Sequence, residues 1–167
     1  MGRKGCRRGL AERCNPITMA VISLFLCLIF VSTMTWKNGG VLESISSTAY
    51  IVSNKISFTL ILSLIGGLLL PAMLEASSEN TQFLAFLTTV GLSTVAVTPN
   101  YRSEDGLQHN IGGFGCCICS QLLVAFNHPA LLLMWLPCLA YLLFFRDKNY
   151  TFWAEITCMS ITYFYSI

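Results

Sequence analysis

The chain has 167 residues, of which 54% are hydrophobic and only 11% are Asp, Glu, Lys or Arg. Soluble domains carry roughly 25% charged residues, so this composition excludes an ordinary soluble domain and favours lipid as the surrounding solvent. The formal net charge of +2 is too small to indicate a nucleic acid as a partner, and none is expected.

Six apolar stretches follow one another along the chain, and we predict that each forms a transmembrane helix. They cover residues 17–36, 56–74, 83–99, 111–127, 129–145 and 152–167. Of the ten Lys and Arg and the eight Asp and Glu residues, only Glu155 lies inside them. Such exclusion is expected from a bilayer, in which each buried ion costs a few kcal/mol or more. We therefore expect an all-α membrane protein.

The number of crossings depends on the later stretches. The first two are long enough to cross a bilayer core of about 30 Å at a rise of about 1.5 Å per residue, whereas the other four are shorter. Only Asn127-His128-Pro129 separates the fourth stretch from the fifth. We expect a bundle of six short helices in a single domain, 17–167, with four crossings plus a re-entrant pair as the alternative. Aromatic residues flank the sixth stretch and predict interfacial belts: Phe152, Trp153, Tyr163, Phe164 and Tyr165.

Residues 1–16 form a basic segment before the first apolar stretch. Its basic residues are Arg3, Lys4, Arg7, Arg8 and Arg13. This resembles the start of a signal peptide, but the 20-residue apolar stretch has no small-x-small cleavage site after it, which favours an uncleaved helix. The dense basic cluster predicts a cytoplasmic tail, and six crossings then place both termini in the cytoplasm. The other five basic residues all fall on the opposite side, so the overall count is a tie.

In that topology the segments 37–55 and 100–110 and the start of the sixth helix share the outer face. Catalytic candidates there are Glu43, Asp105, His109 and Glu155, and ligand-binding candidates are Tyr50 and Arg102. Three carboxylates and a histidine from separate segments suit a metal, a polar headgroup or a scissile bond.

Each candidate has a simpler explanation. As an ionisable residue within a predicted span, Glu155 is a functional candidate by default. The simpler explanation is that its carboxylate reaches the membrane interface beside Arg146 or Lys148. Asp105 and His109 are four residues apart, which on a helix permits a metal pair or a base with its carboxylate. Alternatively, Asp105 belongs to a turn and His109 lies at the edge of the fourth span.

The remaining candidates are read in the same way. Glu43 beside Ser44 and Ser46 resembles a base with a nucleophile, but no Gly-x-Ser-x-Gly motif accompanies it, and capping of a short surface helix is favoured. Arg102 either clamps a phosphate or carboxylate or pairs with Glu104 or Asp105 in solvent.

Cysteines and small residues gather in the fourth stretch. Cys116-Cys117-Ile118-Cys119 contains a C-x-x-C, but no second pair at matching spacing exists to complete a zinc site. Gly112, Cys116 and Ser120 recur every four residues, which favours close helix packing. We expect no metal and no cofactor.

The third stretch ends in Thr98-Pro99, a short polar loop follows, and His109 opens a Gly- and Cys-rich fourth stretch. This order resembles uncharacterised six-span bacterial membrane proteins loosely similar to the DRAM-type families. The resemblance implies six helices and a bacterial inner membrane, and it transfers no catalytic residue. We expect a protein that binds a lipid, a small molecule or a partner helix through a polar outer pocket, and a homo-oligomer or a membrane protein partner stays open as an alternative. The alternative is a membrane-embedded hydrolase or transferase that acts on a lipid-like substrate with His109 and nearby carboxylates.

Overall fold

The computed structural model describes residues 15–103, 105–145 and 149–167, and this part of the chain contains helices, turns and loops but no strand. In chain order the elements are α1 (Pro16–Asn38), η1 (Ile45–Tyr50), α2 (Lys55–Ala76), α3 (Gln82–Val97), α4 (Gly106–Asn127), η2 (Pro129–Met134), α5 (Trp135–Phe145) and α6 (Tyr150–Ser166). The prediction of an all-α fold is confirmed for these residues.

Polar residues set the ends of the long helices. The side chain of Asn15 accepts a hydrogen bond from the Ile17 amide and starts α1, and Asn54 caps α2 in the same way through Ile56. Gly39 caps the end of α1 with a left-handed φ of 71°, which suits a residue without a Cβ. α1, α2 and α4 are long and apolar enough to cross a membrane, with mean hydropathies of 2.4, 2.1 and 1.3.

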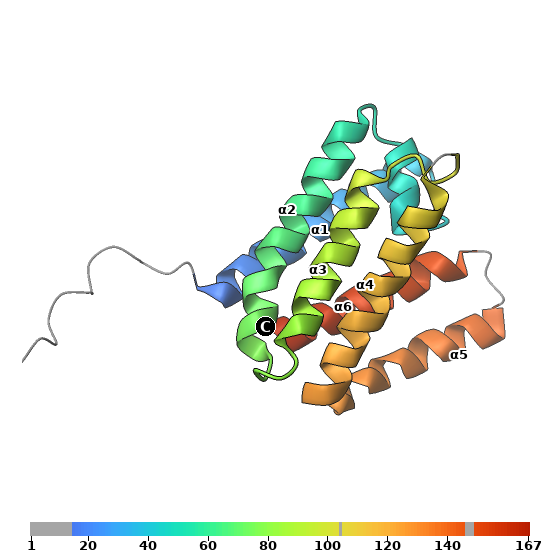
Figure 1. Cartoon of the computed structure of the whole chain (residues 1–167). Coiled ribbons are helices and arrows are strands. Elements are labelled where there is room, and N and C mark those ends of the chain that lie inside the picture. The colour runs from blue at the N-terminus through green and yellow to red at the C-terminus, as the bar shows by residue number, and fades with distance from the viewer. Residues whose placement is uncertain (1–14, 104, 146–148) are drawn as a thin grey trace, which may run out of the picture.

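The helices form two layers (Figure 1). α2, α3 and α4 pack side by side with alternating direction, and α1 and α6 lie across one face of this layer. α5 lies at the edge, against α6 and η2. α6 contacts α1, α2, α4 and α5, so it joins the two layers.

Glycines allow α3 and α4 to approach most closely. A Cβ at Gly91 would lie 2.7 Å from both the Cys116 amide nitrogen and the Gly112 carbonyl oxygen, and one at Gly112 would lie 2.7 Å from Thr94 Cβ. Only a hydrogen at these positions fits, which lets the two backbones touch. The predicted packing role of Gly112 is therefore confirmed.

Segments far apart in the sequence meet at the two ends of the bundle. At one end, which we call the loop end, Glu43 forms an ion pair with Arg102, whose amide donates to the Tyr50 hydroxyl at 2.9 Å. At the opposite end the Ser78 amide donates to Asn127 Oδ1 at 3.1 Å. The predicted outer segments, 37–55 and 100–110, thus share one end of the molecule.

Two details differ from the sequence-based boundaries. α4 begins at Gly106 rather than at residue 111, because its polar first turn packs against the end of α3 and does not need an apolar sequence. The predicted fifth span, 129–145, begins as the 3-10 helix η2 and continues as α5, and Pro129, two residues after the end of α4, favours the break between α4 and η2.

The aromatic-belt prediction is wrong for three of its five residues. Phe152, Tyr163 and Tyr165 are buried at 6%, 3% and 5% exposure, and Phe164 is the largely exposed one of the three aromatic residues at the end of α6. The tyrosines face inward because their hydroxyl groups bond within the bundle: Tyr163 to Ser23 Oγ at 2.7 Å and Tyr165 to Ser77 Oγ at 2.9 Å.

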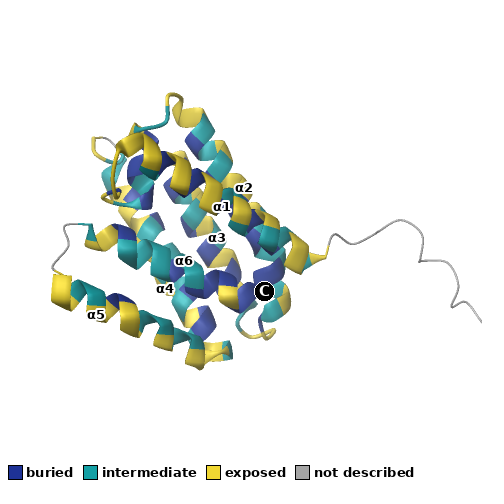
Figure 2. Ribbon diagram, turned by 180° about the vertical axis from the view of Figure 1, so that it is seen from behind, coloured by how far each residue is buried: buried dark blue, intermediate teal, exposed yellow. Residues whose placement is uncertain are grey.

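Large apolar side chains cover the outside of the molecule. Exposed positions run along the outer surfaces of the helices (Figure 2), and Cys138 is the one buried residue of α5. Phe25, Leu60, Phe114 and Phe144 are each more than half exposed. Such a surface is unstable in water and natural in lipid, which agrees with the three candidate spans.

Candidate functional site

A cavity of about 450 Å³ lies between the two helix layers. Residues of α1, α2, α3, α4 and α6 all line it, and most of its wall is apolar. Typical examples are Phe30, Leu62, Leu92 and Met159. Pockets for small molecules commonly occupy about 300–1,000 Å³ and combine apolar walls with a few polar groups, so both the size and the lining suit a ligand.

Polar residues of the wall come largely from the loop end. Those near the loop end are Ser44, Ser46, Tyr101, His109, Asn110, Thr151 and Glu155, and the hydroxyl groups of Thr88, Ser120, Thr162 and Tyr163 lie farther along the helices. The residues near the loop end belong to η1 and its cap, the connection between α3 and α4, and the first turns of α4 and α6. The ionisable and most polar groups of the cavity, His109 and Glu155 among them, therefore lie near one end of the bundle, and the wall farther along the helices is mostly apolar.

His109 is held in one orientation by Thr98. Its Nδ1 lies 3.0 Å from the Thr98 carbonyl oxygen and 3.1 Å from Thr98 Oγ1. The Thr98 hydroxyl itself donates to the Thr94 carbonyl at 2.6 Å, so both groups that face Nδ1 act as acceptors. Nδ1 must then carry the proton, which leaves Nε2 of the neutral ring as an acceptor. Nε2 has no hydrogen-bond partner among the described residues.

Glu155 enters the same cavity from α6. Its Oε2 accepts a hydrogen bond of 2.5 Å from the Ile45 amide, at the first residue of η1. This is the only hydrogen bond to the Glu155 carboxyl group within the part of the chain that the structure describes. The side chain of Ser44 caps the same short helix by accepting from the Ser47 amide at 3.1 Å. A half-buried carboxyl with one backbone donor retains capacity to accept from a ligand.

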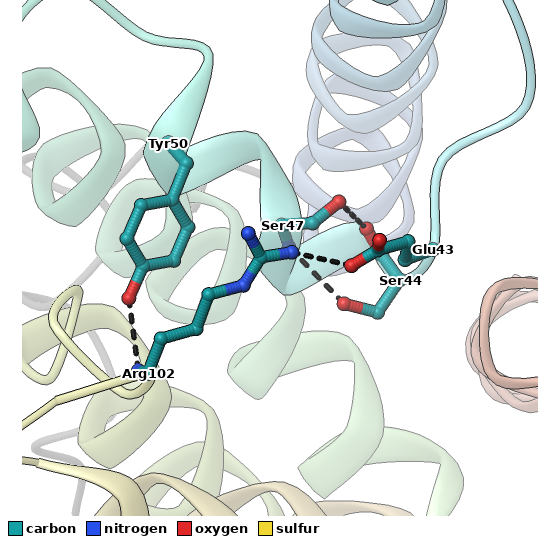
Figure 3. A network of polar contacts seen from close by, with 5 residues as sticks. All are labelled: Glu43, Ser44, Ser47, Tyr50 and Arg102. Atoms are coloured by element: carbon teal, nitrogen blue, oxygen red, sulfur yellow. Dashed lines mark hydrogen bonds and ion pairs between the residues drawn. The ribbon is translucent and has the colours of Figure 1, made fainter.

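Aromatic rings connect His109 to the surface. Tyr101 stacks on the His109 ring, and Tyr50 meets Tyr101 edge to face at 5.2 Å between ring centroids. The Arg102 guanidinium lies 4.8 Å from the centre of the Tyr50 ring and pairs with Glu43 (Figure 3). Burial raises the pKa of the Tyr101 phenol, which keeps this ring neutral at physiological pH.

Thiol groups line the cavity farther from the loop end. Cys116, Cys117 and Cys158 all contribute to its wall. Gln121 Nε2 donates to the Cys158 carbonyl at 3.3 Å, and Trp135 Nε1 donates to Gln121 Oε1 at 2.9 Å. These bonds join α4, α5 and α6. Cys116, the first cysteine of the C-x-x-C motif, thus lines a cavity, whereas Cys119 is absent from the lining.

The predicted site residues separate into two groups. His109 and Glu155 line the cavity, whereas Glu43, Tyr50 and Arg102 form a surface cluster outside its lining. The expectation that three carboxylates converge is therefore wrong for Glu43, because Arg102 holds it at the surface with its side chain 74% exposed. Arg102 pairs with Glu43 rather than with Asp105, and the alternative partner Glu104 lies outside the described residues.

Asp105 occupies the residue before α4 and makes no side-chain capping bond. It is absent from the cavity lining. Within the described residues, no group of three or more His, Cys, Asp or Glu side chains is arranged to hold a metal ion. A metal bound by Asp105 and His109 would thus lack a third protein ligand in this part of the chain. Arg146 and Lys148, the expected partners of Glu155, lie outside the described residues.

Comparisons with known proteins found no matching family model, curated protein or solved structure. The resemblance to DRAM-type proteins stays a prediction.

Proposed function

We propose that this protein is a multi-pass membrane protein that binds a small amphipathic molecule in the cavity between its helix layers. The observation that carries the proposal is the cavity itself, about 450 Å³ in volume, with His109 and Glu155 in an otherwise mostly apolar wall. The ligand's polar group would lie near these two side chains and its apolar part against α1, α2 and α3.

Packing physics supports occupancy of the cavity. Protein interiors are close-packed, and voids larger than a water molecule are few. An apolar cavity of this size is unfavourable when empty and holds water poorly, because water needs two to four polar partners. A ligand that fills it would replace the missing contacts.

The proposal includes six crossings with both termini in the cytoplasm. The alternation of α1 to α4, together with the arrangement of the loops at two ends, supports an even number of crossings. α5 and α6 are shorter, with 11 and 17 residues, and η2 extends α5 by one short helical segment. In this proposal the loop end faces outward from a bacterial inner membrane, and association with a second copy or another membrane protein uses the exposed apolar faces.

A membrane-embedded hydrolase or transferase is the second candidate. The observation in its favour is that His109, with an acceptor at Nε2, and Glu155 line the same cavity. A base in such a position could take a proton from a substrate hydroxyl or from water. The two candidates differ in one consequence: an enzyme consumes the bound molecule, whereas a binding protein releases it unchanged.

The experiment compares two substitutions on the same helix. A Cβ at Gly113 would point toward the cavity wall, with Val95 Cγ2 at 3.7 Å, whereas one at Gly115 would meet nothing within 4 Å. Gly113→Leu should therefore fill the cavity, and Gly115→Leu adds the same volume outside it. The probe is dodecanol, titrated into the purified full chain in phosphatidylcholine nanodiscs.

We expect saturable dodecanol binding by the natural chain and by Gly115→Leu, and a loss of about tenfold or more in affinity for Gly113→Leu. Equal binding by both variants would show that the alcohol only partitions into lipid, and would refute the proposal. Mass spectrometry of the released probe and of copurified molecules then separates binding from turnover.

A further inference from the structure

We propose that the cavity selects amphiphiles whose head group is a primary ammonium, in preference to fatty acids and other anionic lipids. This inference rests on the proposed function and adds the chemical class of the ligand. It is carried by the arrangement of charges and hydrogen-bonding groups around the polar part of the cavity.

The charges of the lining have one sign. Glu155 supplies the carboxyl group of the described cavity lining, and no Lys or Arg occurs among these lining residues. Two basic side chains at the loop end are engaged elsewhere. Arg102 pairs with Glu43 and lies over the Tyr50 ring, and Lys55 Nζ donates to Asn100 Oδ1. An anionic head group would therefore meet a carboxyl group without a cation to balance it.

Hydrogen bonds leave acceptors where the ligand would lie. His109 commits its Nδ1 proton to Thr98, so Nε2 accepts. Glu155 takes one bond from the Ile45 amide, and its carboxyl oxygens have further acceptor sites. A primary ammonium has three N–H donors and no acceptor, which complements both groups. A carboxylate has acceptors only and complements neither.

Burial makes this complementarity decisive. In a low-dielectric cavity, opposite charges attract more strongly than in water, and an uncompensated charge is correspondingly more costly. A cation beside Glu155 would offset the free-energy cost of desolvating its carboxylate, whereas an anion would increase that cost by repulsion. The mostly apolar remainder of the wall then accommodates the hydrocarbon part.

The experiment measures the binding of three probes with the same alkyl chain, dodecylamine, dodecanol and dodecanoate, to the full chain in phosphatidylcholine nanodiscs. The variants are Glu155→Gln, which keeps the shape of the side chain and removes its charge, and Glu43→Gln, which does the same at the exposed surface pair. Thermal unfolding of each variant reports whether it is folded.

We expect dodecylamine to bind the natural chain at least about tenfold more tightly than dodecanoate. Glu155→Gln should reduce the affinity for dodecylamine by about tenfold and change the affinity for dodecanol little. Glu43→Gln should leave all three affinities unchanged, because its carboxylate lies outside the cavity lining.

Equal or tighter binding of dodecanoate would overturn the inference and leave the cavity proposal standing. Absence of specific binding by all three probes, with no effect of Gly113→Leu, would instead refute the proposed function. Should Glu155→Gln fail to fold, the order of the three probes on the natural chain still decides the question.

Discussion

The ring of Tyr101 stacks on the imidazole of His109, with 4.3 Å between the ring centroids and an angle of 23° between the planes. Tyr101 belongs to the connection between α3 and α4, and His109 lies in the first turn of α4. Both residues line the cavity. The stack thus places a loop residue, exposed on one side to the surface cluster, directly over a buried residue of the cavity wall.

This stack predicts that Tyr101 limits exchange of a bound molecule. Tyr101→Leu removes the ring and its contacts with both Tyr50 and His109, and we expect at least about threefold faster dissociation of dodecanol with a loss of about 1–2 kcal/mol in stability. Stopped-flow displacement of the probe measures the rate. Tyr101→Phe is the matched control, since it retains the ring, and its rate should stay close to that of the natural chain.

A second prediction concerns the contact between α3 and α4. Gly91→Ala would place a methyl group 2.7 Å from the backbone of α4, which must move, so we expect a loss of about 1–3 kcal/mol in the free energy of unfolding. Gly67→Ala in α2 meets nothing within 4 Å and should be neutral or stabilising by up to about 1 kcal/mol. Thermal unfolding in detergent compares the two. A more stable Gly91→Ala protein would contradict the close approach of these helices.

The bond between Ser23 and Tyr163 supports a third prediction. Ser23 Oγ donates to the Ile65 carbonyl at 2.8 Å, so the Tyr163 hydroxyl donates to Ser23. Ser23→Ala leaves that hydroxyl without its acceptor in the core and should cost about 1 kcal/mol. In a double-mutant cycle with Tyr163→Phe, the double variant should lose less stability than the sum of the single variants. Strict additivity would show that the two groups do not interact.

Topology is the fourth prediction. Single cysteines replace Val41, Ser78, Ser103 and Tyr150 in a cysteine-free chain, and intact cells are treated with a membrane-impermeant thiol reagent. With six crossings and a cytoplasmic N-terminus, Val41, Ser103 and Tyr150 label from outside, and Ser78 labels only after permeabilisation. Labelling of Tyr150 only after permeabilisation would contradict both topologies, because two crossings and a re-entrant pair each return the chain to the outer side. A further single cysteine at His128 separates them: six crossings place it in the cytoplasm, where it labels after permeabilisation, whereas a re-entrant pair keeps it within the bilayer, where it does not label.

The hydropathy pattern predicts the positions of the apolar helices well, because a long apolar stretch can be recognised in the sequence without knowing which residues it packs against. α1 and α2 differ from the predicted 17–36 and 56–74 by at most two residues at each end. The first turn of α4 was missed, since Gly106 to Asn110 carries the polar groups that the bundle buries or presents at the loop end. The capping of a short helix by Ser44 was predicted correctly from its residue type.

Pairing between distant segments could not be derived from the sequence. Glu155 was selected as the only ion within an apolar stretch, but nothing in its neighbourhood indicates the Ile45 amide, 110 positions away in the chain. His109 was likewise selected without its partner, Thr98. The contribution of Cys116, Cys117 and Cys158 to one wall required the crossing of α4 and α6, which composition does not encode.

The position of α6 across the other helices has a consequence for biosynthesis. α6 supplies Glu155, Cys158 and Tyr163 to the cavity, and it is the last helix of the described chain to leave the ribosome. Until it docks, the face formed by α2, α3 and α4 is an open groove, and the first residue of η1 lacks its carboxyl acceptor. The cavity that we propose as the binding site is therefore closed only once α6 has packed against the helices made before it.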